Sequence, residues 1–403
     1  MKESTRVLLA VVVAIVMGIA IAATHNAALI RAADFIAPFG ALWVNAIRMT
    51  VIPLVVSLLV IGVSSAADIR AVGRIGGRTL LVFLGLLVGT AIVVMPLCVA
   101  LARLLPRNAA QQIPAALPLD AERQTFAAWL TSLLPSNPIG AAASGAMMPL
   151  ILFTLLFALA ILRSPQTSRE TLTRFFRAVA DAMLTLVRWV ILVAPIGVFA
   201  LVLPLAVHAG ATLAGAIGVY IVVYSIVCVV VTLLLYPVVA LVAKIPMRVF
   251  ARAALPPQLI AFSSSSSIAT LPALVESAES PLVLPEKVRD FVLPLAVSTF
   301  KIAAPLSWTV GALFVGWFYG IPLGAGALST IAFAAVFLAF AVPGIPRGAF
   351  IMLTPLFLAI GLPAEGIGIL IAVDAIPDTF ATVLNTTGDL AAAALVGGRA
   401  AGE

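Results

Sequence analysis

The sequence predicts an all-α polytopic membrane protein with eight transmembrane helices and two re-entrant helical hairpins, for three reasons. Of its 403 residues, 63% are hydrophobic and 10% are charged, and the mean hydropathy is +1.22. Ordinary soluble domains are about 25% charged, so this composition excludes one. Long apolar runs recur between Val7 and Asp389, and about 20 such residues cross a bilayer as a helix. Two further apolar segments are interrupted by polar residues or by prolines near their middle, as in hairpins.

Eight apolar runs are expected to span the membrane, each bounded by charged residues or by turn-forming residues. Proline inside a run predicts a kink or an interruption, because it removes one backbone hydrogen bond. The polar, proline-bearing segment 106–138 is expected to be the longest external loop. The expected helices are 7–23, 36–65 with an interruption at Pro53, 78–105, 140–162, 172–207 with kinks at Pro195 and Pro204, 211–243, 285–319 and 361–396.

The two hairpins are expected at 256–280 and 330–360. The first contains five consecutive serines, Ser263 to Ser267, between apolar arms too short to span. Such a run is tolerated at membrane depth only where protein or water satisfies its hydroxyl groups. The second breaks at Pro343-Gly344-Ile345-Pro346. A full helix with polar groups near its centre follows each hairpin, which indicates an inverted-repeat transporter with a site between broken elements.

Basic residues predict the topology. They cluster in three connections, which the positive-inside rule places in the cytoplasm together with both termini. We therefore expect a multi-pass protein of the inner or plasma membrane, with the lipid bilayer as its partner and no nucleic acid. The two cysteines lie inside apolar runs and are expected to be packing residues. The basic clusters are Arg70, Arg74 and Arg78; Arg163, Arg169, Arg174 and Arg177; and Lys244, Arg248 and Arg252.

The run from Ile371 to Asp389 carries ionisable and amide groups inside an apolar segment. As a single helix it would place its polar groups within a sector about 80° wide. Ionisable residues inside a membrane typically mark a substrate or ion path, whereas the simpler interpretation is polar packing between helices. The polar residues of this sector are Asp374, Asp378, Thr382, Asn385 and Asp389.

Enzyme activity is not expected. The two histidines lie near predicted helix ends, and no Gly-x-Ser-x-Gly motif surrounds the serine run, so an intramembrane hydrolase is disfavoured. No cofactor or structural metal is expected. A channel remains an alternative, because hairpins also line pores, and saturable flux of an organic solute would distinguish a transporter from it.

The chain resembles the dicarboxylate/amino acid:cation symporter family, which includes glutamate and neutral amino acid transporters, over nearly its whole length. The matching motifs are QLIAFSSSSSIATLP at 258–272, FVLPL at 291–295, Gly-Ile-Pro at 344–346 and VDAIPDTFATVLNTTGD at 373–389. The resemblance implies a homotrimer with the glutamate-transporter-like fold. It also implies scaffold helices at 1–68 and 139–209, and a moving transport domain at 72–105 and 211–403.

The family's substrate-site residues can be transferred onto this sequence where the motifs match. Asp378 then receives the substrate ammonium and Asn385 meets its carboxylate, with Thr382 facing the substrate. A carboxylate is a charge-assisted acceptor for an ammonium, and an amide donates to a carboxylate without adding charge. The hairpin residues that match are Ser266 and Ser267 in the first tip and Ile345 and Pro346 in the second.

Two departures from the family bear on the substrate side chain. The arginine that holds an acidic side chain is replaced by Ala381, and a threonine of the family's helix-seven motif is replaced by Ala304. A neutral amino acid is therefore expected. The alternatives are an acidic amino acid or dicarboxylate symporter that uses Arg347 beside the second tip, and an uncoupled exchanger or channel.

Other departures remove oxygen atoms from positions that resemble sodium ligands. Phe300 and Ile302 stand where the family has asparagine and aspartate, so at least one sodium site should be absent, because hard cations need several oxygen ligands. A residual cation site near Ser298 stays open. Lys301 is a cation inside an apolar run, with Asp389 and Asp374 as candidate partners.

Lys301 leaves two interpretations open. It forms a permanent buried ion pair, or its ammonium replaces a sodium ion and its protonation couples transport to protons. The expected function is thus secondary transport of a zwitterionic amino acid by an elevator-type movement. The proton is then a more plausible coupling ion than sodium.

Overall fold

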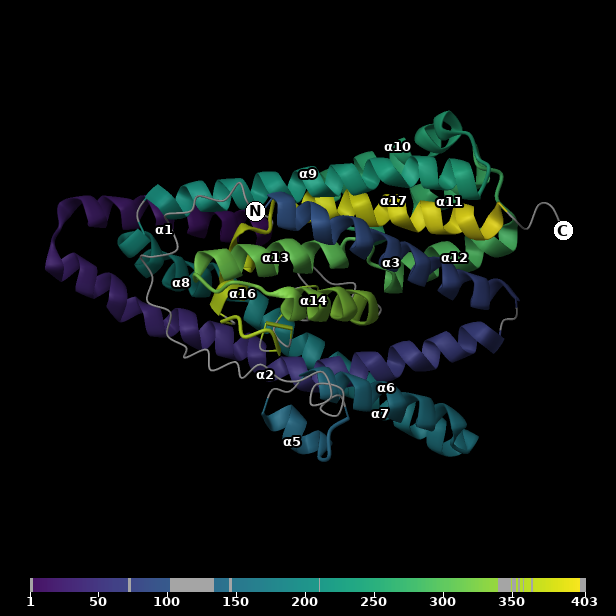
Figure 1. Cartoon of the computed structure of the whole chain (residues 1–403), viewed down its shortest axis with the longest axis horizontal. Coiled ribbons are helices and arrows are strands. Elements are labelled where there is room, and N and C mark those ends of the chain that lie inside the picture. The colour runs from purple at the N-terminus through teal and green to yellow at the C-terminus, as the bar shows by residue number, and fades with distance from the viewer. Residues whose placement is uncertain are drawn as a thin grey trace.

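The structure is a computed structural model. It describes residues 3–71, 74–101, 134–144, 147–209, 211–339 and 365–398, together with residues 349, 353, 356, 357 and 359–363. Over these residues all regular secondary structure is helical. Most helices run along the long axis of the molecule (Figure 1). Most of the loop expected at 106–138 lies outside the described residues, as do residues 340–348 of the hairpin expected at 330–360, which include its expected break.

The helices follow the apolar runs closely. In the first half of the chain they are α1 (Glu3–Thr24), α2 (Ala27–Ala71), α3 (Arg74–Leu101), α5 (Pro138–Ala143), α6 (Met147–Arg163), α7 (Gln166–Leu192), α8 (Ala194–Ala209) and α9 (Ala211–Val242). In the second half they are α10 (Met247–Ser264), the short 3-10 helix η2 (Ile268–Thr270), α11 (Leu271–Glu279), α12 (Glu286–Thr299), α13 (Ala304–Phe318), α14 (Ala325–Leu338), α16 (Glu365–Val373) and α17 (Pro377–Gly397).

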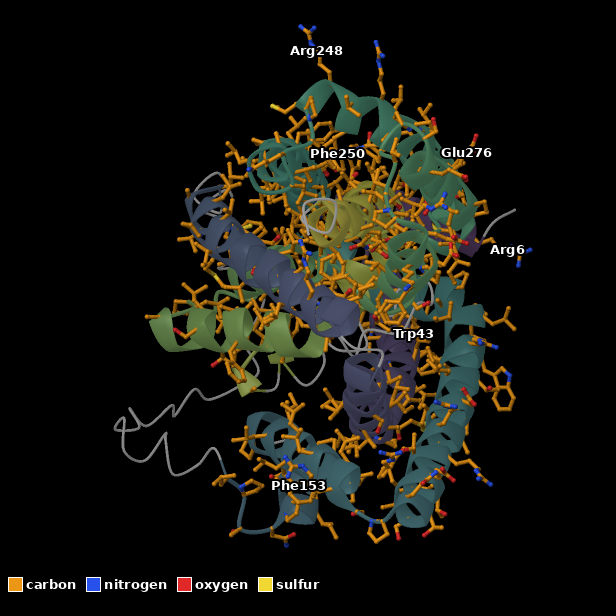
Figure 2. All side chains as sticks on the ribbon, turned by 90° about the vertical axis from the view of Figure 1, so that its right-hand side faces the viewer. Arg6, Trp43, Phe153, Arg248, Phe250 and Glu276 are labelled. Atoms are coloured by element: carbon orange, nitrogen blue, oxygen red, sulfur yellow. The ribbon has the colours of Figure 1, made fainter. Side chains whose placement is uncertain are left out.

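Five helical segments among the described residues are long and apolar enough to cross a membrane, or six if a bent pair counts as one. They are Ala27–Ala46, Ile75–Leu101, Leu213–Val242, Glu286–Phe318 and Pro377–Gly397. This confirms an all-helical polytopic membrane protein. The C-terminal end of α2 and the N-terminal end of α3, like the α6–α7 and α9–α10 connections, lie toward the right-hand side of Figure 1, and these regions carry the basic clusters. Arg248 points outward at this end (Figure 2).

The bent pair consists of α7 and α8, which meet at 57°. The bend lies beside Pro195, where a kink was expected, and it leaves backbone carbonyls at the end of α7 without helical partners. The indole N–H of Trp43 on α2 donates to one of them, the carbonyl of Val190, at 2.9 Å. Gly197 lets the chain pass Trp43 closely, because a Cβ there would overlap the indole ring. A buried side chain of α2 thus stabilises the bend.

One expectation about proline is wrong, because α2 continues through Pro53 without an interruption. Pro204 also lies inside a continuous helix, α8, and the kink expected there stays a prediction. One proline removes a single helical hydrogen bond, and packing of α2 against α6, α7 and α8 can maintain the helix around that gap. Proline alone therefore did not locate the breaks.

The helices pack in two groups. The first contains α1, α2, α6, α7 and α8, and the second contains α3, α9, α10, α12, α13 and α17. α17 lies at the centre of the second group, where it contacts α3, α9, α10 and α12. Its C-terminal end is capped by Arg78 of α3, whose guanidinium donates to the carbonyl of Leu395 at 3.2 Å. A cation there also offsets the negative end of the helix dipole.

The helices expected at 285–319 and 361–396 are both broken. Residues 300–303 separate α12 from α13, and residues 374–376 separate α16 from α17. Pro305 and Pro377 follow these breaks as early residues of α13 and α17. Neither proline can donate to the carbonyl four residues earlier, and its ring clashes there. Lys301 therefore lies in a non-helical interruption of the candidate span Glu286–Phe318, and Asp374 lies in the non-helical break between α16 and α17.

Candidate functional site

The first hairpin is formed by α10 and α11, which pack against each other. It begins at Met247, earlier than the expected 256, because α10 continues through Pro256 and Pro257. Ser265 ends α10 in the left-handed conformation, with φ of 50°, and its N–H donates to the carbonyl of Ala261. This residue turns the chain, so the serine run forms the tip as expected.

The tip is fastened to α17 at its first turn. The Ser265 and Thr379 hydroxyl oxygens lie 3.0 Å apart. Deeper along the hairpin, the amide of Gln258 donates to the hydroxyl of Thr387 at 2.8 Å. Ser265, Thr379 and Gln258 were not among the predicted site residues, although each is a polar residue within a motif that the sequence singled out.

Ser266 and Ser267, the predicted tip residues, are half-buried. The Ser266 N–H donates to the Ser264 hydroxyl at 3.2 Å, and its own hydroxyl accepts from the N–H of Ala269. The carbonyl of Ser267 accepts the hydroxyl of Thr270 at 2.6 Å. Local bonds thus hold the backbone of the tip in one arrangement.

One face of α17 carries the polar residues expected from the sequence. At 100° per residue, its members fall within a sector about 60° wide. Asp374 is excluded, because the break at 374–376 lies between it and the helix. The buried carboxylate of Asp374 instead acts electrostatically on Tyr220 and Tyr224 of α9. The face of α17 consists of Asp378, Thr382, Asn385 and Asp389.

Asn385 joins this face to the break between α12 and α13. Its Oδ1 accepts the backbone N–H of Ala303 at 2.9 Å. This N–H lies in a non-helical segment, where it has no acceptor of the regular helical kind, and the Asn385 side chain takes that place. An amide whose oxygen is engaged in this way directs its two Nδ2 hydrogens to another acceptor, such as a carboxylate.

Asp378 lies in the first turn of α17 and is half-buried. The N-terminus of a helix favours a negative charge. The hydroxyl of Thr382 donates to the Asp378 carbonyl at 2.7 Å. Because the Thr382 hydroxyl already donates its hydrogen within the helix, its oxygen can only accept a hydrogen bond from a ligand.

The two alanines that depart from the family lie beside Asn385. Ala381 lies one helical turn before Asn385 on α17. Ala304 follows Ala303, the residue whose N–H Asn385 accepts. Both alanines are buried. Neither side chain offers a hydrogen bond or a charge. The wall beside Asn385 is therefore apolar at both positions.

Lys301 is 9% exposed, and its ammonium donates to the carbonyl of Val297 at 2.7 Å. The two carboxylates whose charges act on it are Asp389 and Asp378. Phe300 beside it stacks on Phe83 of α3, with ring centroids 4.4 Å apart. Within the part of the chain that the structure describes, the Val297 carbonyl is thus the hydrogen-bond acceptor of the Lys301 ammonium.

Asp389 is fully buried, and neither of its carboxylate oxygens has a hydrogen-bond partner among the described residues. Buried polar groups are usually paired, and among the described residues Asp389 is the carboxyl group of which both buried oxygens lack a partner. The next residue towards the N-terminus, Gly388, contacts the break closely. A Cβ at Gly388 would lie 2.6 Å from Ile302.

The remaining predicted residues fall into two sets. Ser298 is exposed, and its hydroxyl donates to the carbonyl of Pro294 at 2.7 Å. Within the described ranges, no group of three or more metal-ligating His, Cys, Asp or Glu side chains occurs. The second-hairpin residues Ile345, Pro346 and Arg347 lie outside the described residues.

Comparison with known proteins relates this site to a family of transporters. Residues 4–398 match the model of the sodium:dicarboxylate symporter family. The proton/glutamate-aspartate symporter of Escherichia coli (strain K12) is 26% identical over 375 residues, which cover 90% of this chain and 85% of that protein. The proton/sodium-glutamate symport protein of Bacillus subtilis (strain 168) is 30% identical, with the same coverage of both chains.

Neutral amino acid transporters match as well. Neutral amino acid transporter B(0) of Oryctolagus cuniculus is 30% identical, in an alignment that covers 96% of this chain and 78% of that protein. Identity alone therefore does not separate acidic from neutral substrates, and the residues of the site must.

Proposed function

The chain belongs to the sodium:dicarboxylate symporter family, and on that premise we propose that it transports a zwitterionic, neutral amino acid without requiring sodium. Membership makes it a secondary transporter and not an enzyme. Relatives are named as proton or sodium symporters for glutamate and as neutral amino acid transporters. The choice among these functions rests on the α17 face.

The substrate head group binds along α17. Asp378 receives the ammonium and Asn385 donates to the carboxylate through Nδ2. The observation that carries this proposal is the bond from Ala303 to Asn385 Oδ1, because it orients the amide with its donors away from that bond. Ser266, Ser267, Ile345 and Pro346 complete the site from the two hairpin tips.

The side-chain end of the site accepts a neutral group. Ala381 and Ala304 are both buried and offer no partner for a second carboxylate. A buried carboxylate without a partner keeps its desolvation cost. An acidic substrate would need Arg347, which is the second candidate function.

Transport occurs by an elevator-type movement. The two packing groups support this, because α3, α9, α10, α12, α13 and α17 pack chiefly on one another. The eight spanning helices, the second hairpin, the trimer and the cytoplasmic termini belong to this proposal. The basic connections at one end of the molecule favour that orientation (Figure 1).

A binding screen tests the proposal. Purified protein is titrated with alanine, serine, aspartate and glutamate in sodium chloride and in choline chloride. We expect the neutral amino acids to bind more tightly than the acidic ones, with equal affinity in both salts. Tighter binding of aspartate would redirect the assignment to Arg347, and binding that requires sodium would contradict the proposed coupling.

A further inference from the structure

The buried carboxyl group of Asp389 and the ammonium of Lys301 are close in the fold but are not bonded to each other. The close contact of Gly388 with Ile302 and the hydrogen bond of Asn385 with Ala303 hold α17 against the break that contains Lys301. The charges of Lys301 and Asp389 act on each other. Yet the ammonium donates to Val297, and the Asp389 oxygens have no partner among the described residues.

An ionised carboxylate in this position would be unusual. Asp389 has no exposed surface, and a buried charge is normally paired or neutralised. A proton on the carboxyl group removes that charge without moving a neighbour. The arrangement therefore matches a protonated Asp389 beside a lysine that is bound elsewhere.

We infer that Asp389 holds a proton in this conformation and releases it when the Lys301 ammonium leaves the Val297 carbonyl and binds the carboxylate. The hydrogen bond to Val297 breaks and an ion pair forms. The proton leaves to solvent, and the positive charge of the Lys301 ammonium takes its place beside the Asp389 carboxylate. The flexible four-carbon stem of lysine permits such a movement.

Other titratable groups lie on α17 and on the elements packed against it. Among the described residues, Lys301, in the break between α12 and α13, is the group whose charge acts on Asp389. Tyr224 of α9 bonds to Ser307, and Arg78 of α3 bonds to Leu395. The others are Asp374 in the break before α17, Asp378 of α17, Tyr220, Tyr236 and Cys228 of α9, Cys98 of α3, Arg248 and Arg252 of α10, Glu276 and Glu279 of α11, and Glu286, Lys287, Arg289 and Asp290 of α12.

The same break connects this pair to the substrate site. Ala303 is bonded to Asn385, and Lys301 lies two residues earlier in the same non-helical segment. If Asn385 binds the substrate carboxylate, any movement of Asn385 is transmitted through Ala303 to Lys301, which lies in the same segment 300–303. Substrate binding can then trigger the release of the Asp389 proton, which couples transport to protons. This step rests on the proposed transport function.

Infrared spectroscopy tests the proton without any substrate. We expect the purified protein at neutral pH to show the C=O stretching band of a protonated carboxyl group. Asp389→Asn should lose it, and the exposed matched variant Asp290→Asn should retain it. In Lys301→Met the band should persist to higher pH than in the wild type, because no ammonium can replace the proton. A wild-type protein without the band would overturn the inference, whichever variants fold.

Transport provides the second measurement. Alanine uptake into proteoliposomes is compared with and without an inward proton gradient. We expect the gradient to stimulate wild-type protein and the exposed control Lys287→Met, but neither Lys301→Met nor Asp389→Asn. Stimulation that survives in both site variants would overturn the coupling. A wild type that transports no amino acid would refute the proposed function instead, and the infrared result would still decide the protonation of Asp389.

Discussion

Replacing Asp378 with asparagine tests the head-group site most directly. The substitution preserves shape but removes the charge that should receive the substrate ammonium. Asp378 is half-buried at the first turn of α17, so a bound amino acid would complete its burial. Removing one partner of a buried ion pair typically costs about 3–5 kcal/mol. At about 1.4 kcal/mol for each factor of ten, affinity should fall roughly a hundredfold to a few thousandfold.

Folding is measured separately from binding. A carboxylate in the first turn of a helix contributes about 0.3–1 kcal/mol through the helix dipole, so a melting temperature for Asp378→Asn shows whether a loss of affinity reflects a loss of fold. Isothermal titration with the best neutral amino acid from the screen measures affinity, and a thermal melt measures folding. Asp290→Asn, an exposed change on α12, should bind as the wild type does. A folded Asp378→Asn protein that binds within threefold of wild type would refute the reasoning.

Three further predictions follow from the contacts around α17 and α8. Asn385→Leu should weaken amino acid binding and also lower the free energy of unfolding by about 1–3 kcal/mol, because the buried Ala303 N–H loses its acceptor; a thermal melt equal to wild type would contradict this. Ala381→Arg should raise the affinity for aspartate relative to alanine about tenfold or more in competition binding, since a guanidinium pairs with a carboxylate, and an unchanged ratio would argue against a side-chain site there. Gly197→Ala should destabilise by about 1–3 kcal/mol through overlap with Trp43, and a denaturation midpoint equal to wild type would show that the bend between α7 and α8 tolerates the methyl group.

Much of the architecture could be predicted because membrane insertion depends on composition along the chain. Apolar runs predicted most helices within a few residues, such as 211–243 for α9 (Ala211–Val242). The serine tip was also predictable, since five hydroxyls at membrane depth need a turn that protein can satisfy. The proline at the α7–α8 bend was informative, whereas Pro53 was not, because α2 continues through it.

The sequence by itself determined the membrane class, the first hairpin tip and the polar face of α17, because each depends on local hydropathy and helical spacing. Only the tertiary structure decided where the late helices break, which acceptor holds Lys301 and how Asn385 is oriented. Those outcomes depend on donors and acceptors contributed by other helices, as when Asn385 of α17 binds the N–H of Ala303. A one-dimensional pattern cannot contain such partners. The pattern places Lys301 and Asp389 inside apolar runs, but the fold bonds the Lys301 ammonium to Val297 and leaves the Asp389 carboxyl group without a hydrogen-bond partner among the described residues.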